Sequence, residues 1–209
     1  MAEQSFIERL GEHRLLGIIR GGDPQASIAS ALTLAEAGAR FFEISLTSAD
    51  ALHVLREVTR QAGGHVEVGA GTVLTPADAD AALEHGAGYI VTPALAPSVA
   101  HAVSAGVPVL AGAMTPTEVL SAVDQGADAV KIFPAGRFGP GYLKDLRGPF
   151  PEVPLVPVGG VGVEDVPAYL GQGALAVGVA TPLCGDAPDG GSLEDLRSRA
   201  GQFLEAVRQ

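Results

Sequence analysis

Two ionisable residues stand inside apolar segments and are the first candidates for chemistry. Lys131 lies in the middle of Asp128-Ala-Val-Lys-Ile-Phe-Pro134, and Glu43 follows Phe41-Phe42 in a similar run. An amine in an apolar pocket loses its proton more readily than in water and can attack a ketone to form a Schiff base, while a nearby carboxylate moves protons. The alternative is a buried ion pair without a chemical role, although hydrophobic replacements of such pairs are often as stable.

Further polar candidates stand where apolar segments end. Arg20 can hold a substrate carboxylate or simply be a solvated arginine, and Thr72 can offer a hydroxyl group beside it. Two glycine-containing stretches, 158–162 (Val-Gly159-Gly160-Val-Gly) and 178–181 (Gly-Val-Ala-Thr181), can bind phosphate through backbone N–H groups. Their alternative role is to form tight turns, and neither matches a nucleotide-binding fingerprint.

A repeat along the chain indicates which elements position these residues. Gly86, Gly106 and Gly126 each end a helix-like segment and are spaced by 20 residues, about the length of one helix, one strand and two short loops. The opposite junction places a capping residue before a proline at Asp23-Pro24, Thr75-Pro76 and Thr115-Pro116. These junctions predict alternating helices and strands.

Eight apolar strands are predicted from this pattern: Leu15–Arg20, Arg40–Leu46, Val66–Val73, Gly88–Pro93, Val107–Ala113, Ala127–Phe133, Pro154–Gly159 and Leu175–Ala180. Eight such units favour a (β/α)8 TIM barrel, an α/β fold, as one domain over 1–209 with an extra N-terminal helix over 3–14. The rival, a doubly wound sheet, usually has a glycine fingerprint after its first strand. In a barrel, alternation along the strands directs Lys131 and Glu43 inward.

Composition excludes several classes of function. With a net charge of -11 among 209 residues, the chain offers no basic surface to nucleic acid or an anionic membrane. The uncharged run 86–117 is divided by prolines and glycines, which argues against a membrane span. The charged N-terminus is unlike a signal peptide, and we expect a cytoplasmic protein.

Neither a metal nor a cofactor is expected. The five histidines lie at no metal-ligand spacing, and the single cysteine, Cys184, is interpreted as a small apolar core residue rather than a nucleophile.

Six motifs in order along the chain resemble the 2-keto-3-deoxy-6-phosphogluconate (KDPG) / 4-hydroxy-2-oxoglutarate (KHG) aldolase family. They are Phe42-Glu-Ile44, Gly69-Ala-Gly-Thr-Val73, Val91-Thr-Pro93, Thr115-Pro-Thr-Glu118, Val130-Lys-Ile-Phe-Pro134 and Val158-Gly-Gly-Val161. The resemblance implies a metal-independent class I aldolase, usually a homotrimer, that cleaves a phosphorylated 2-keto-3-deoxy sugar acid into pyruvate and glyceraldehyde 3-phosphate.

The resemblance also implies roles for residues of this sequence. Lys131 matches the Schiff-base lysine and Glu43 the acid/base that moves protons through a water molecule. Residues around the pyruvate unit are matched by Arg20, Thr72, Pro93 and Phe133, and the phosphate-binding stretches contain Gly159, Gly160 and Thr181.

Three positions depart from many gluconate-type members. Thr47 stands in place of an arginine, Ala180-Thr181 in place of a Gly-Ser pair, and Val158 in place of a threonine, the last as in the 6-phosphogalactonate branch. The family resemblance implies the gluconate as the substrate, and these departures keep the galactonate epimer and 4-hydroxy-2-oxoglutarate as alternatives. More distant alternatives are a sugar-phosphate isomerase or epimerase, and a catalytically silent metabolite-binding barrel.

Overall fold

The computed structural model of the chain describes residues 4–209. Its eight strands are all parallel and adjoin in the order β7-β6-β5-β4-β3-β2-β1-β8. They are β1 (Leu15–Ile19), β2 (Phe41–Ser45), β3 (Glu67–Gly71), β4 (Ile90–Val91), β5 (Val109–Ala113), β6 (Ala129–Ile132), β7 (Leu155–Pro157) and β8 (Val177–Val179).

The sheet closes on itself between β7 and β8. Val158 forms a parallel bridge with Gly178, and the Leu175 N–H donates to the Leu155 carbonyl at 2.9 Å. The predicted (β/α)8 barrel is confirmed, with each strand somewhat shorter than expected.

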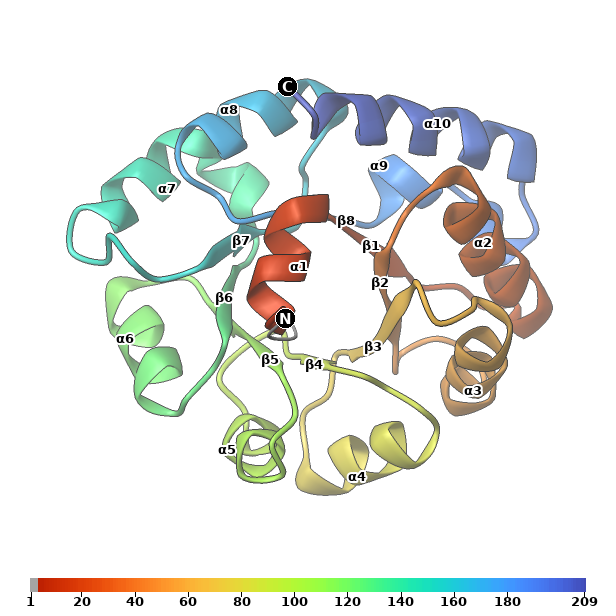
Figure 1. Ribbon diagram of the computed structural model, residues 1–209, viewed down its shortest axis with the longest axis horizontal. Helices are drawn as coiled ribbons and strands as arrows, with labels where there is room; N and C mark the ends of the chain where they lie inside the picture. Colours follow the sequence, from red (N-terminus) through yellow and green to blue (C-terminus); the bar gives the residue numbers. More distant parts are fainter. Residues whose placement is uncertain (1–3) are drawn as a thin grey trace.

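Helices surround the strands as an outer ring (Figure 1). They are α2 (Pro24–Ala37), α3 (Ala51–Gln61), α4 (Pro76–Glu84), α5 (Pro97–Ser104), α6 (Pro116–Asp124), α7 (Gly139–Arg147), α8 (Val166–Gly171), α9 (Thr181–Cys184) and α10 (Leu193–Ala206). Short 3-10 turns cover Ala135–Arg137, Val163–Asp165 and Ala187–Asp189. The extra N-terminal helix, α1 (Phe6–His13), lies across one end of the barrel in Figure 1 and buries Phe6 and Leu10 there.

The predicted helix starts have the expected capping geometry. The Asp23 carboxylate accepts from the backbone N–H groups of Gln25 and Ala26, which satisfies two donors at the start of α2. Thr75 and Thr115 form complete capping boxes with the acidic residues three positions later. The repeated glycines follow the helix ends with positive φ, at 93° for Gly86 and 84° for Gly126, a region that favours glycine.

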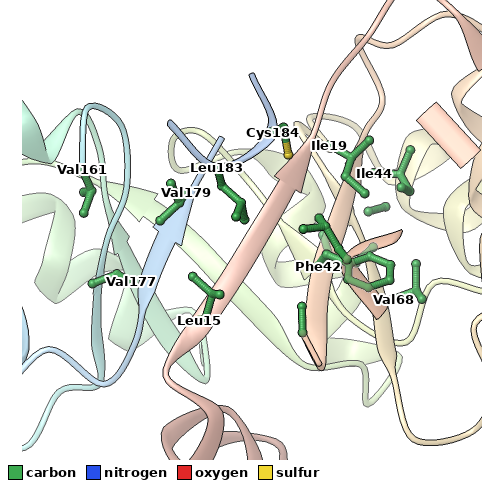
Figure 2. Close-up of a cluster of buried hydrophobic side chains, with 14 of the residues drawn as sticks. Leu15, Ile19, Phe42, Ile44, Val68, Val161, Val177, Val179, Leu183 and Cys184 are labelled. Atoms are coloured by element: carbon green, nitrogen blue, oxygen red, sulfur yellow. The ribbon is translucent and has the colours of Figure 1, made fainter. Parts of the chain in front are cut away.

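Alternation along the strands divides the apolar side chains into two clusters. The inner cluster fills the barrel and includes Phe41, Leu110 and Val156. The outer cluster lies between strands and helices. Part of it is shown in Figure 2, with side chains from β1, β2, β3 and β8 beside Leu183 and Cys184. Phe42 and Ile44 belong to the outer cluster, so Glu43 between them points inward, as predicted.

Cys184 packs in this outer cluster. Its side chain is buried, its thiol donates to the Ile18 carbonyl at 3.4 Å, and burial raises its pKa to about 12. A thiol held in its protonated form is a poor nucleophile, which agrees with a packing role. No helix within residues 4–209 is long and apolar enough to cross a membrane.

Candidate active site

Lys131 and Glu43 meet inside the barrel from opposite sides. The Lys131 Nζ lies 3.7 Å from Glu43 Oε1, and both side chains are almost fully buried. Lys131 is on β6, between Gly112 of β5 and Val156 of β7 in register, while Glu43 is on β2. The structure therefore brings together the two residues that the sequence singled out.

The surroundings of Glu43 prepare its carboxyl group for proton transfer. Burial raises its pKa above 4.5, and the charge and hydrogen-bonding capacity of Lys131 oppose that rise in part. The second oxygen, Oε2, has no hydrogen-bonding partner among residues 4–209. A carboxylate with a free acceptor and a raised pKa can take up a proton at a higher pH than an exposed glutamate.

The glycines of Gly69-Ala-Gly71 on β3 provide the space that Glu43 needs. A Cβ on Gly71 would lie 2.3 Å from Glu43 Oε1, and one on Gly69 would lie 2.4 Å from Cε2 of Tyr89. Both distances are far below van der Waals contact, so larger residues on this face of β3 would displace the carboxylate or the aromatic ring.

A cavity of about 570 Å³ opens above the lysine and glutamate at the carboxyl ends of the strands. Its lining contains all ten predicted site residues: Arg20, Glu43, Thr72, Pro93, Lys131, Phe133, Val158, Gly159, Gly160 and Thr181. A larger hollow of about 690 Å³ lies at the opposite end beside α1, but the ionisable side chains that line it are exposed. Because Lys131 and Glu43 are buried at the base of the first cavity, that cavity is the candidate active site.

Three hydroxyl groups form a row along the cavity wall. Ser45 Oγ lies 2.8 Å from Thr47 Oγ1 and 3.1 Å from Thr72 Oγ1. Thr72 has φ of 61°, a left-handed conformation that costs a β-branched residue roughly 1–2 kcal/mol. Ser45 was not predicted as a site residue, although it shares the inward face of Glu43 and could have been included on that ground.

The mouth of the cavity carries a cation and an aromatic ring. Arg20 is exposed, and its guanidinium group donates to no other residue in the described part of the chain. Phe133 is 41% exposed, and its ring centroid lies 5.7 Å from Lys131 Nζ. An anionic group entering the cavity would meet a free guanidinium above the buried amine.

The glycine stretches form the remaining wall. Gly159 and Gly160 have φ of 89° and 75°, and the N–H groups of Gly160 and Val161 donate to no carbonyl within residues 4–209. Helix α9 begins at Thr181 on the neighbouring side of the cavity. Unpaired N–H groups facing a cavity can bind an anion. Among the described residues, no three His, Cys, Asp or Glu side chains gather as a metal centre would require.

Comparisons with known proteins agree with this arrangement. The family model described as "KDPG and KHG aldolase" matches residues 6–188. The chain is 34% identical to the 2-dehydro-3-deoxy-6-phosphogalactonate aldolase of Escherichia coli, over 93% of this chain and 95% of that protein. It is also 34% identical to the 2-dehydro-3-deoxy-phosphogluconate aldolase of Pseudomonas aeruginosa, over 76% and 73% of the respective chains.

Solved structures show the same likeness. The structure described as "Native KDPGal structure" has a TM-score of 0.89 at 31% identity and covers 100% of this chain and 98% of its own. The 4-hydroxy-2-oxoglutarate aldolase/2-deydro-3-deoxyphosphogluconate aldolase from TTHB1 has a TM-score of 0.84 at 36% identity, over 98% and 100% of the two chains. With its barrel, its motifs and these relatives, the chain belongs to the KDPG and KHG aldolase family.

Proposed function

We propose that this chain is a class I aldolase that cleaves 2-keto-3-deoxy-6-phosphogluconate, and also its galactonate epimer, reversibly to pyruvate and glyceraldehyde 3-phosphate. The observation that carries the proposal is the buried Lys131 amine, 3.7 Å from a buried carboxylate at the floor of a cavity. An isomerase or epimerase does not need such a lysine.

In the proposed reaction, Lys131 is the nucleophile. Its amine attacks the C2 ketone of the substrate, and loss of one water molecule leaves a protonated imine. The imine then serves as the electron sink, a role that a metal ion plays in other aldolases. The apolar neighbours of Lys131 on β5, β6 and β7 exclude bulk water, which would otherwise hydrolyse the imine before the carbon–carbon bond breaks.

Glu43 is the proposed acid/base. It accepts the proton of the C4 hydroxyl through a water molecule, the C3–C4 bond breaks, and the electron pair moves into the imine to give an enamine. Glyceraldehyde 3-phosphate leaves, C3 takes up a proton, and hydrolysis of the imine releases pyruvate. The raised pKa of the Glu43 carboxyl suits a group that must alternate between base and acid.

The rest of the cavity is proposed to hold the two anionic ends of the substrate. Arg20 and the hydroxyl group of Thr72 would bind the carboxylate, with Pro93 and Phe133 packing on the pyruvate unit. The backbone N–H groups around Gly159, Gly160 and Thr181 would bind the phosphate.

Acceptance of both epimers follows from Val158. Its side chain lines the cavity, is 3% exposed and packs against Gly178. A valine offers no hydrogen bond to a C4 hydroxyl in either configuration, so discrimination between the epimers is expected to stay within about tenfold. Relatives that act on phosphogalactonate and on phosphogluconate are both similar to this chain.

Trapping with pyruvate and borohydride tests the proposal directly. The chain has only two lysines, Lys131 and the exposed Lys144 on α7, so the site of labelling can be assigned without ambiguity. We expect one reduced pyruvyl group on Lys131, none on a Lys131→Ala variant, and undiminished labelling and turnover in the matched control Lys144→Ala. Label on Lys144 would exclude Lys131 as the nucleophile, and an unmodified protein would exclude the Schiff base and leave an isomerase or a silent binding barrel.

A homotrimer in the cytoplasm is part of the proposal. The outer surface of α6 exposes Leu120 and Val123 at 50% and 41%, and apolar patches of this kind are typical of subunit contacts. The free, buried Cys184 suits a reducing compartment. Light scattering that gives the mass of one chain would contradict the trimer, and cell fractionation checks the location.

A further inference from the structure

Two buried oxygens inside the barrel have no hydrogen-bonding partner among residues 4–209. They are Glu43 Oε2 and the hydroxyl oxygen of Tyr89, whose side chain is fully buried. Buried polar atoms are almost always paired, either with protein groups or with an ordered water molecule. Each of these two oxygens therefore requires a partner that the side chains and backbone of residues 4–209 do not supply.

The two side chains lie in successive layers above the same strand. Glu43 is paired in register with Gly69 on β3, and its carboxylate reaches over Gly71, two residues further along. The Tyr89 ring, which directly precedes β4, covers Gly69, with its Cζ 2.5 Å from where a Cβ would be. Two residues of a strand span roughly 7 Å, a separation that leaves room for one water molecule between the ring and the carboxylate.

The lower side of the Tyr89 ring is closed by apolar groups. Its centroid is 5.1 Å from that of Phe6 on α1 and 6.3 Å from that of Phe41 on β2. Neither ring can accept the hydroxyl proton in an ordinary hydrogen bond. The Glu67 carboxylate also lies within electrostatic reach of Tyr89, but both of its oxygens already accept from Arg9. Among the carboxylate oxygens that affect Tyr89, Glu43 Oε2 is therefore the unpaired acceptor.

We propose that Tyr89 is a positioning residue for Glu43, acting through one buried water molecule that accepts from the Tyr89 hydroxyl and donates to Glu43 Oε2. The bridge satisfies both oxygens and holds Oε2 away from the lysine, so that Oε1 stays directed at Lys131. This inference rests on the proposed acid/base role of Glu43 and adds a residue beneath it.

The charges around the carboxylate fix the direction of the effect. Among the described residues, Lys131 from β6 and Tyr89 beside β4 interact electrostatically with Glu43, Arg20 lines the same cavity at its exposed mouth, and Ile18 of β1 presents apolar surface beside it. Burial, with the charges of Glu43 and Glu67, raises the pKa of Tyr89 well above 10, so its hydroxyl group remains a donor throughout the working range of pH. Removing this donor should therefore raise the pKa of Glu43.

Tyr89→Phe tests the bridge because it keeps the ring and removes only the hydroxyl group. Carbon-13 label at the glutamate carboxyl carbons, assigned by the signal that Glu43→Gln loses, reports the titration of Glu43 without reference to turnover. We expect the midpoint to move up by about 0.5–1 pH unit, and the acid limb of kcat/KM to move with it while KM changes little.

Tyr169→Phe is the matched control, since Tyr169 is equally buried but packs in the outer cluster on α8. Its substitution should leave the Glu43 midpoint unchanged. An unchanged midpoint in Tyr89→Phe would overturn the proposal, as would an equal shift in both variants.

A high-resolution crystal structure of the unaltered protein gives a second, independent measurement. A water molecule within hydrogen-bonding distance of both oxygens is expected, and its absence from clear density would overturn the bridge. Pyruvate labelling of Lys131 should persist in Tyr89→Phe. If the titration or the crystal structure contradicts the water bridge while Lys131 is still labelled, only this inference is wrong. If the unaltered protein is not labelled, the proposed function is wrong.

Discussion

Gly71→Ala is predicted to abolish most of the activity while leaving the barrel folded. The added methyl group would lie 2.3 Å from Glu43 Oε1 and 2.7 Å from its Cδ. Real Cβ contacts lie beyond about 3.4 Å, so the carboxylate must move by roughly 1 Å or more. The atoms that clash are the far end of a flexible side chain, and Gly71 has no positive φ, so the backbone can accept alanine.

The expected loss of rate follows from that displacement. A misplacement of about 1 Å in a catalytic group costs on the order of 10²-fold in rate, and loss of a positioned acid/base costs roughly 10² to 10⁴. We therefore expect kcat to fall at least about 10²-fold with a smaller effect on KM, because Arg20 and the glycine stretches proposed to bind the anionic ends lie on other strands and loops. The assay is the initial rate of pyruvate release over a range of substrate concentrations.

Gly88→Ala provides the matched control. Its Cβ would lie 3.6 Å from the nearest atom, an ordinary contact, and the residue also lacks a positive φ. This variant should keep kcat within about twofold, and thermal melting should show both variants folded. A Gly71→Ala enzyme with kcat within about threefold of the unaltered protein would refute the argument that this glycine makes room for the carboxylate.

The remaining predictions concern Glu43, Val158 and metal ions. Glu43→Gln should slow turnover by roughly 10² to 10⁴, and undiminished activity would exclude the acid/base role. Because the pKa of Glu43 is raised, its basic form is lost as pH falls through a value above 4.5, so kcat/KM should decline there; a profile flat down to pH 4.5 would contradict this. Val158→Thr should shift the ratio of kcat/KM values for the two epimers toward the gluconate by roughly 5- to 30-fold. An unchanged ratio would mean that another residue distinguishes the two configurations at C4. Activity should survive EDTA, since the imine is the electron sink; a loss restored by a divalent ion would overturn that.

Local rules were sufficient to predict the fold and the two central residues. A proline after a capping residue marks three helix starts, and glycines at a fixed spacing mark helix ends, so the order of elements could be predicted without tertiary information. Alternation along a strand placed Lys131 and Glu43 inward because their neighbours are apolar. Strand ends were less predictable. Pro93, for example, has no N–H group to continue the ladder, and β4 ends at Val91.

Features that depend on contacts between strands could not be predicted. The Ser45–Thr72 hydrogen bond joins residues 27 positions apart, and the left-handed conformation of Thr72 has no signal in its sequence neighbourhood. Gly69 and Gly71 were predicted within a strand, but their need to be glycine becomes evident only when the side chains of two neighbouring strands are placed above them. Tyr89 looks like one more apolar strand residue, because nothing local indicates that its hydroxyl group is buried without a partner.

The vertical order of groups inside the barrel sets the direction in which a substrate must bind. Apolar rings from Phe6, Phe41 and Tyr89 close the floor at the α1 end, and the amine and the carboxylate lie nearer the mouth. Hydroxyl groups come next, followed by the exposed Arg20 and the free N–H groups of the glycine stretch at the mouth. A phosphate cannot be desolvated against the apolar floor without a large penalty, so it must stay at the mouth. In the proposed reaction, the keto carbon of the same molecule then faces Lys131, and the bond to be broken would lie between the amine and the glycine stretch, beside Glu43.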